Sequence, residues 1–195
     1  VKDHIKSDIL QSAAPLFLEK GYLKVPMREI AHKSGVGVSN IYNYFSCKDD
    51  IFVQIVTPAV RTFENMLDEH HGRRGTDIMA MCDRDYFKYI VDEYTSFIHR
   101  HRDLLLLLLF RSQGSSLENY KEEFARKSTA LVKEYFTLMK HKHPQLETDI
   151  SDFSIRMHTV WMFALFEELL MRRVKPDEIE KVVTEYMTIE VAGWR

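Results

Sequence analysis

Apolar residues recur along this chain with the period of an α-helix almost throughout. Within residues 2–20, Ile5, Ile9 and Phe17 fall on one face, and Gly21 follows as a residue that ends helices well. No stretch shows the two-residue alternation of a half-buried strand. The pattern therefore predicts an all-α chain of about nine helices, at residues 2–20, 27–34, 38–45, 47–70, 77–100, 102–112, 116–142, 149–172 and 176–193.

The segment 27–45 has the spacing of a helix-turn-helix. Two helices that cross steeply over a short turn need a small residue at the crossing, and Ala31 supplies it. The chain must then reverse direction, which favours a left-handed backbone, and Gly35 permits that conformation. Three apolar side chains of the segment are expected to pack against the first helix: Ile30, Val36 and Ile41.

The second helix of such a unit lies in the major groove of DNA, with its N-terminal residues at the base edges. Asparagine can pair bidentately with adenine, serine can donate or accept, and valine can touch a thymine methyl group. The expected base-reading residues are Val38, Ser39, Asn40 and, one turn later, Asn43. The expected phosphate contacts are Tyr42, Tyr44 and Lys48, and Arg28 is expected to reach a base or a phosphate.

The start of the next helix is predicted by a second local signal. Ser46 and Asp49 have the spacing of a capping box, with Ser46 as the N-cap. Lys48 would then lie in the first helical turn, where backbone amides and the helix dipole attract phosphate.

Charge is distributed unevenly between the two ends of the chain. Residues 1–48 carry seven Lys or Arg and four Asp or Glu, a net +3, whereas residues 49–195 carry 20 and 25, a net −5. A basic head on an acidic body fits a DNA-binding domain at 1–48 and a different domain at 49–195, although strongly basic domains are more usual. Two cysteines, no apolar leader and no membrane-length apolar run predict a cytoplasmic protein that does not contact a membrane.

The middle of the chain is rich in Met, Phe and Tyr. Such residues suit an apolar ligand pocket with a few polar anchors, and they suit an ordinary core equally well. The candidate pocket residues are Tyr94, Phe97, Phe110, Arg111, Gln113, Tyr135, His158 and Trp161.

The helix predicted at 149–172 is apolar on nearly all sides. A helix of this kind must be buried nearly all round, so one face can pack on its own domain while the other meets a partner. The alternative is a thick monomeric core. The candidate dimer-interface residues are Met162, Phe166, Leu169, Leu170, Val183 and Tyr186.

Nothing in the sequence supports an enzyme. It contains no phosphate-binding glycine loop and no convincing nucleophile–base set. The histidine pairs His99/His101 and His141/His143 diverge by about 200° on a helix and chelate poorly. We therefore expect solvated histidines, including His70 and His71, with no metal site and no cofactor.

The first 55 residues resemble the TetR family of bacterial regulators. Two departures from the family pattern are Gly37, where Ser or Thr often caps the recognition helix, and Val25-Pro26, where a Thr often precedes the first helix of the unit. The resemblance implies a homodimer that represses at a palindromic operator until an unidentified small molecule binds the C-terminal domain. A body that binds a protein partner is the alternative. The resemblance rests on Ile30-Ala31, Gly35-Val36, Ile41-Tyr42, Tyr44-Phe45, Lys48 and Ile51.

Overall fold

The structure, a computed structural model, describes residues 2–193. Within these residues every regular element is helical, which confirms the predicted all-α class. None of the helices described is long and apolar enough to cross a membrane. In chain order the elements are α1 (Lys2–Lys20), α2 (Met27–Ser34), α3 (Val38–Ile41), α4 (Lys48–His71), the short 3₁₀ helix η1 (Ala80–Cys82), α5 (Arg84–Phe110), α6 (Tyr120–Lys142), α7 (Asp152–Met171) and α8 (Pro176–Gly193).

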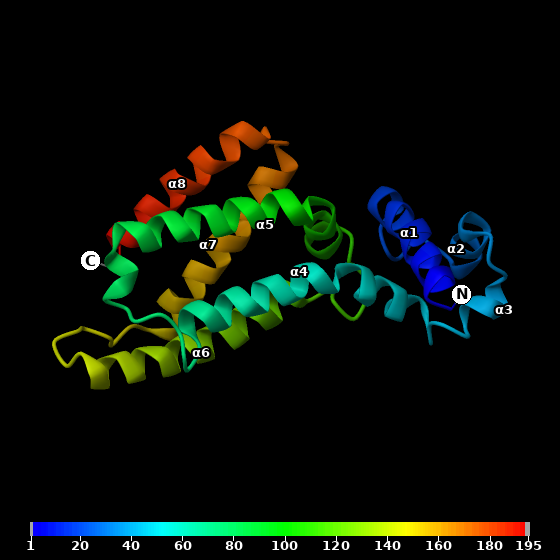
Figure 1. Cartoon of the computed structure of the whole chain (residues 1–195). Helices are drawn as coiled ribbons and strands as arrows, with labels where there is room; N and C mark the ends of the chain where they lie inside the picture. The colour runs from blue at the N-terminus through cyan, green and yellow to red at the C-terminus, as the bar shows by residue number, and fades with distance from the viewer. Residues whose placement is uncertain (1, 194–195) are drawn as a thin grey trace. The chain divides into compact units, whose positions relative to one another are not determined.

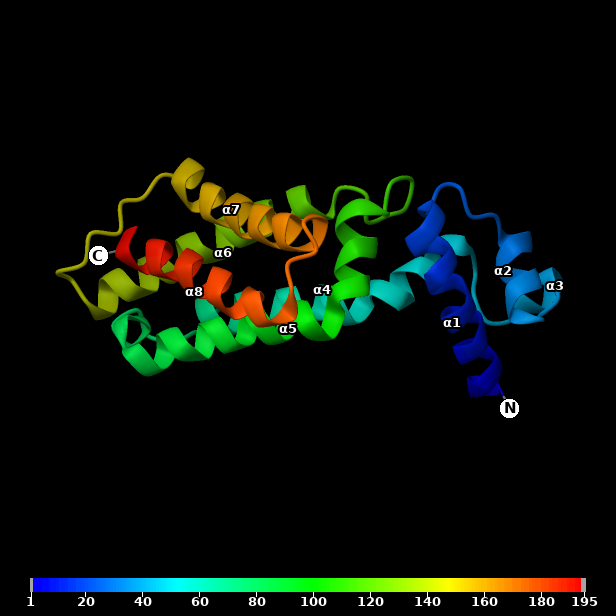
Figure 2. The same ribbon diagram turned by 90° about the horizontal axis from the view of Figure 1, so that it is seen from above.

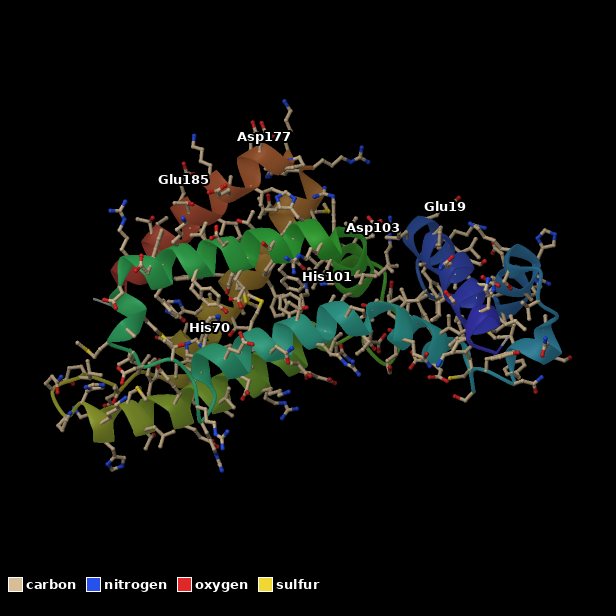
Figure 3. All side chains as sticks on the ribbon, in the orientation of Figure 1. Glu19, His70, His101, Asp103, Asp177 and Glu185 are labelled. Carbon is tan, nitrogen blue, oxygen red and sulfur yellow. The ribbon has the colours of Figure 1, made fainter. Side chains whose placement is uncertain are left out.

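The described residues form eight α-helices, where the sequence predicted about nine. The helices predicted at 77–100 and 102–112 are one helix, α5, whose backbone leaves helical geometry at His101 (φ −120°, ψ 22°; Figure 3). Neither Gly nor Pro lies between Arg84 and Phe110, so nothing in that stretch forces the helix to end. The predicted break between the two helices is therefore present as a kink at His101.

The chain folds as two compact units. Unit 1 consists of the chain up to Arg61 together with Asp103–Tyr120. Unit 2 consists of Thr62–Arg102 together with the chain from Lys121 onward. Helices α4 and α5 therefore each contribute one end to each unit. The division at residue 48 stays a prediction about function, and that residue lies within unit 1.

Unit 1 contains α1, α2, α3 and the N-terminal part of α4 (Figure 1). Helix α1 ends where Gly21 adopts φ +80° and its amide donates to the Phe17 carbonyl at 2.8 Å. The rings of Phe17, Tyr22 and Phe52 then pack together, with Phe52 centred 5.3 Å from Phe17 and 5.2 Å from Tyr22. Aromatic packing of this kind joins the end of α1 to α4.

The segment that follows α5 is also tied to the N-terminal helices of unit 1. The Tyr22 amide donates to the Arg111 carbonyl at 2.9 Å. The Ser116 amide donates to the Asp49 carboxylate at 2.9 Å. These two bonds hold the segment after α5 against both the end of α1 and the first turn of α4.

Unit 2 has an aromatic centre in which Phe63 of α4 touches a ring from each of three other helices. Its ring centroid lies 4.7 Å from Phe97 of α5, 5.6 Å from Phe124 of α6, and 5.3 Å from both Phe163 and Phe166 of α7. Seen from above, α8 lies between α5 and α7 (Figure 2). All five rings are buried, so the centre of the unit is filled by side chains.

The C-terminal end of α4 carries two histidines that the sequence predicted to be solvated, and that prediction was wrong. His70, labelled in Figure 3, is buried, with Nε2 2.7 Å from the Glu93 carboxylate and Nδ1 2.7 Å from the Tyr86 hydroxyl. The His71 ring packs edge-on against Tyr135 at 5.2 Å. His70 is buried and His71 is half-buried by partners 16 to 64 residues away in the chain, and a local sequence pattern gives no sign of such partners.

His71 makes acid sensitivity an expected property of unit 2. Burial, reinforced by the neighbouring His70, lowers the pKa of His71 from 6.5 to about 4. The folded state disfavours the charged form of the His71 ring. The contribution of the neutral ring to stability is therefore complete above pH 6.5 and is lost as the pH falls towards 4. The loss should approach about 3 kcal/mol in the free energy of unfolding, measured by urea titration at a series of pH values.

The variant His71→Phe should flatten this pH dependence, since it removes the titrating group. The matched variant His99→Phe, at an exposed position of α5, should retain it. An equal pH dependence in wild type and His71→Phe would assign the effect to other groups.

Candidate nucleic-acid interface

Helices α2 and α3 are joined by the left-handed turn that the sequence predicted. Gly35 adopts φ 68°, ψ 15°, and its amide lies within reach of the carbonyls of Ala31 and His32. The Val36 amide then donates to the Ala31 carbonyl at 3.1 Å. These bonds satisfy carbonyls at the end of α2 and send the chain directly towards Gly37, which caps α3.

One side of the α2–α3 unit is packed and the other is open to solvent. Ile30 and Ile41 are fully buried, which confirms two of the three predicted packing residues, while Val36 is half-buried. Phe45 is also buried, so it belongs to the core. The exposed side chains include five of the predicted DNA-contacting residues: Val38, Ser39, Asn40, Tyr42 and Asn43.

The recognition helix is shorter than predicted. Regular α-helix ends at Ile41, and the chain to Phe45 continues as turns in which Asn43 donates to the Asn40 carbonyl and Tyr44 to the Ile41 carbonyl. The prediction of a helix to Phe45 was wrong. Asn and Tyr have modest helix propensity, and the chain must turn here to reach α4.

Two of the predicted base readers are hydrogen-bonded to each other. The Asn43 side-chain amide donates to the Asn40 side-chain oxygen at 2.9 Å. This bond orients the Asn40 side chain through its Oδ1 atom. The NH₂ group of Asn40 takes no part in the bond. An asparagine held in this way has fewer rotamers to lose when it pairs with a base.

The start of α4 is capped one residue away from the predicted position. Both the amide and the hydroxyl of Ser46 contact the Asp50 carboxylate, at 3.1 and 3.2 Å. The predicted partner, Asp49, instead accepts from the Ser116 amide. The capping box with Asp49 was therefore wrong, because a long-range contact competes for that carboxylate.

The predicted phosphate contacts occupy different environments. Arg28 is exposed on α2, and Tyr44 is half-buried. The Lys48 ammonium is directed into unit 1, where it donates to the carbonyls of Tyr22 and Val25 at 2.9 and 3.0 Å.

Comparison with known proteins identifies this helix-turn-helix. The sequence profile described as "Bacterial regulatory proteins, tetR family" matches residues 9–55, which include all of α2 and α3. Over this segment the chain is similar to TetR-family regulators. A relative is the probable HTH-type transcriptional regulator YttP of Bacillus subtilis, which is 27% identical over 104 residues, covering 53% of this chain and 48% of that protein.

Solved structures of other proteins share this fold over nearly the whole chain. The fatty acid degradation regulator FadR from Bacillus halodurans matches with a TM-score of 0.68 at 18% identity, over 98% of this chain and 96% of that one. FadR from Bacillus subtilis, solved with stearoyl-CoA, matches with a TM-score of 0.62 at 16% identity, over 93% and 96%. The chain spans about half to two thirds of the length of the curated relatives it matches.

The residues that were predicted to line a ligand pocket are divided between the two units. Phe110, Arg111 and Gln113 belong to unit 1, where Arg111 and Gln113 are exposed, and the other five belong to unit 2, so a pocket shared by all eight stays a prediction. In unit 2, Tyr135 uses its hydroxyl to donate to the Thr76 carbonyl at 2.7 Å. Composition alone could not distinguish residues that fill a core from residues that surround a cavity.

The remaining predicted pocket residues are also dispersed within unit 2. Tyr94 stacks on Phe166 at 5.6 Å, and the His158 ring lies 5.4 Å from that of Trp161, which is 48% exposed. Phe97 forms part of an open pocket of about 330 Å³ between α4 and α5. Its other lining residues are Thr62, Tyr89, Asp92, Glu93, Ser96, Arg100 and His101.

The predicted dimer-interface residues lie mostly inside the protomer. Phe166, Leu169, Leu170 and Val183 are buried within unit 2, while Met162 and Tyr186 are half-buried, and their role in a dimer interface stays a prediction. Helix α7 is apolar on both faces, and periodicity does not say which face turns inward. The apolar side chains that α7 leaves exposed lie on one stripe: Phe153, Val160, Trp161, Ala164 and Met171.

Proposed function

We propose that the chain is a transcriptional regulator that binds a palindromic DNA operator as a homodimer through α3. The observation that carries this proposal is the placement of polar and aromatic side chains on the open side of a helix-turn-helix whose other side is packed by Ile30, Ile41 and Phe45. A rigid short helix with exposed Ser39 and Asn40 can present hydrogen-bonding groups to base edges. The curated relative YttP is described as a probable HTH-type transcriptional regulator.

The direct test is a titration of the chain against the DNA upstream of its own gene, with a random-sequence library as a second substrate. Retarded complexes on an electrophoretic gel, with a site enriched from the library, would support the proposal. Failure to bind either substrate at low salt would overturn it.

Asn40 should determine sequence preference. The variant Asn40→Ala removes the side chain that Asn43 orients, so discrimination at one base pair of each half-site should fall by about 1–3 kcal/mol while other positions keep theirs. Competition binding with operators that carry single base changes measures this effect. Asn119→Ala, at an exposed position of unit 1 outside α2 and α3, is the control and should leave the preference unchanged.

The body supports a second proposal, that a small molecule binding unit 2 releases the operator. An effector can act only if its affinity differs between conformations that bind DNA and conformations that do not. The open pocket between α4 and α5 is a candidate entrance, and the structurally similar FadR of Bacillus subtilis was solved with stearoyl-CoA. Stearoyl-CoA is therefore the first effector to test, by its ability to dissociate the operator complex.

The filled aromatic centre around Phe63 favours the alternative, in which the body binds a protein partner. A long acyl chain would need those rings to move apart. Calorimetric titration of the chain with stearoyl-CoA and with shorter acyl-CoAs would separate the two proposals.

A further inference from the structure

The ammonium group of Lys48 is held inside unit 1. It donates to the Tyr22 carbonyl at 2.9 Å and to the Val25 carbonyl at 3.0 Å. It also lies 4.2 Å from the centre of the Tyr22 ring, within the range of a cation–π contact. An ammonium has three N–H donors, so two of the three are already engaged.

The two carbonyls belong to the two ends of one turn. Residues 22–25 connect α1 to α2, and the Val25 amide donates back to the Tyr22 carbonyl at 3.3 Å. Pro26 follows at once and occupies the N-cap position of α2 with no side-chain cap. The direction in which α2 leaves this turn therefore depends on how the turn is held.

Three other contacts hold Tyr22, the residue whose carbonyl and ring Lys48 contacts. Its amide donates to the Arg111 carbonyl, and its ring packs on Phe17 and Phe52. Partial burial lowers the pKa of Lys48 below its ordinary value, which agrees with a side chain drawn into the protein. Lys48, the first residue of α4, is thus bonded to Tyr22, which is itself packed against α1 and α4.

We propose that Lys48 is a positioning residue of the DNA-binding unit: it fixes the turn at residues 22–25, and through it α2 and α3, and its charge does not neutralise a DNA phosphate. This inference rests on the proposed DNA binding. It differs from the phosphate contact expected from the sequence, because the ammonium is already engaged with main-chain oxygens. A compact ammonium fits between two carbonyls, whereas a planar guanidinium has a different shape and donor geometry.

The test compares three variants of the full chain by thermal melting without DNA and by fluorescence anisotropy on the operator across a salt series. Lys48→Met keeps the length of the side chain and removes its charge. Lys48→Arg keeps the charge and changes the donor geometry. Lys24→Met removes one charge from an exposed position of the same turn and controls for net charge.

We expect Lys48→Met to lower the melting temperature by about 4 °C or more. At a temperature where it remains folded, it should weaken operator binding on the order of tenfold, as expected for lost hydrogen bonds to a charged donor. The slope of log affinity against log salt should stay that of wild type. Lys48→Arg should fail to restore operator affinity, and Lys24→Met should keep the melting temperature within about 1 °C.

Different results would overturn the inference. A salt slope that is smaller by about 0.9 in Lys48→Met would show a lost phosphate contact. Full operator affinity in Lys48→Arg would show that charge alone is needed. Unchanged operator affinity in folded Lys48→Met, or equal destabilisation by Lys24→Met, would remove the positioning role. If wild type binds no DNA, the proposed function fails, whereas an unchanged melting temperature in Lys48→Met would refute the link itself.

Discussion

Replacing Phe63 with alanine should lower the free energy of unfolding by about 3–5 kcal/mol, the typical loss when a core phenylalanine is truncated to alanine and leaves a cavity. Phe63 is 1% exposed and touches rings from α5, α6 and α7, so its removal leaves a gap that faces three helices at once. Rigid neighbouring rings cannot collapse easily into such a gap, which places the expected cost high in that range. Urea-induced unfolding followed by circular dichroism measures the change.

The control is Leu138→Ala, which truncates a large apolar side chain at a 43% exposed position of α6. It should change stability by no more than about 1 kcal/mol. If Phe63→Ala were no more costly than Leu138→Ala, the aromatic centre would be loosely packed. That result would in turn strengthen the proposal that unit 2 opens to admit an effector.

The helix-turn-helix could be predicted from the sequence because its determinants are local. The left-handed residue Gly35, the buried Ile30 and Ile41, and the exposed Ser39 and Asn40 all lie within a span of 12 residues. Their spacing fixes their geometry, since the chain between them has few ways to fold. The error at the Ser46 cap arose because Asp49 is engaged by Ser116, 67 residues away. The error at the end of α3 arose from the modest helix propensity of Asn and Tyr after Ile41.

The body could be predicted only to the level of helices, because its contacts are long-range. The sequence predicted solvated histidines at 70 and 71, yet His70 is bonded to Glu93 and Tyr86, and His71 packs against Tyr135. Aromatic residues looked equally suited to a cavity or to a core, and the structure assigns most of them to the core. Helix propensity and periodicity do not predict which helices, distant in the sequence, will pack against each other.

Introducing arginine at Ala164 should convert the proposed homodimer into a monomer. Ala164 lies on the exposed apolar stripe of α7, between Trp161 and the 67% exposed Met171. A two-fold interface brings the same patch of both copies together, so one substitution would place two unpaired charges in an apolar contact. Because leaving a charge buried without a partner typically costs about 3–5 kcal/mol, the dimer dissociation constant should rise by at least about 100-fold.

Analytical ultracentrifugation over a concentration series gives the dissociation constant, and operator binding should weaken in parallel because a palindromic site needs both α3 helices. Leu138→Arg is the matched control, since it adds the same charge at an exposed position of α6 and should remain dimeric. A wild-type chain that sediments as a monomer would refute the dimer itself. A dimer that Ala164→Arg leaves intact would mean that the copies meet elsewhere, and the exposed stripe of α7 would then need a different partner.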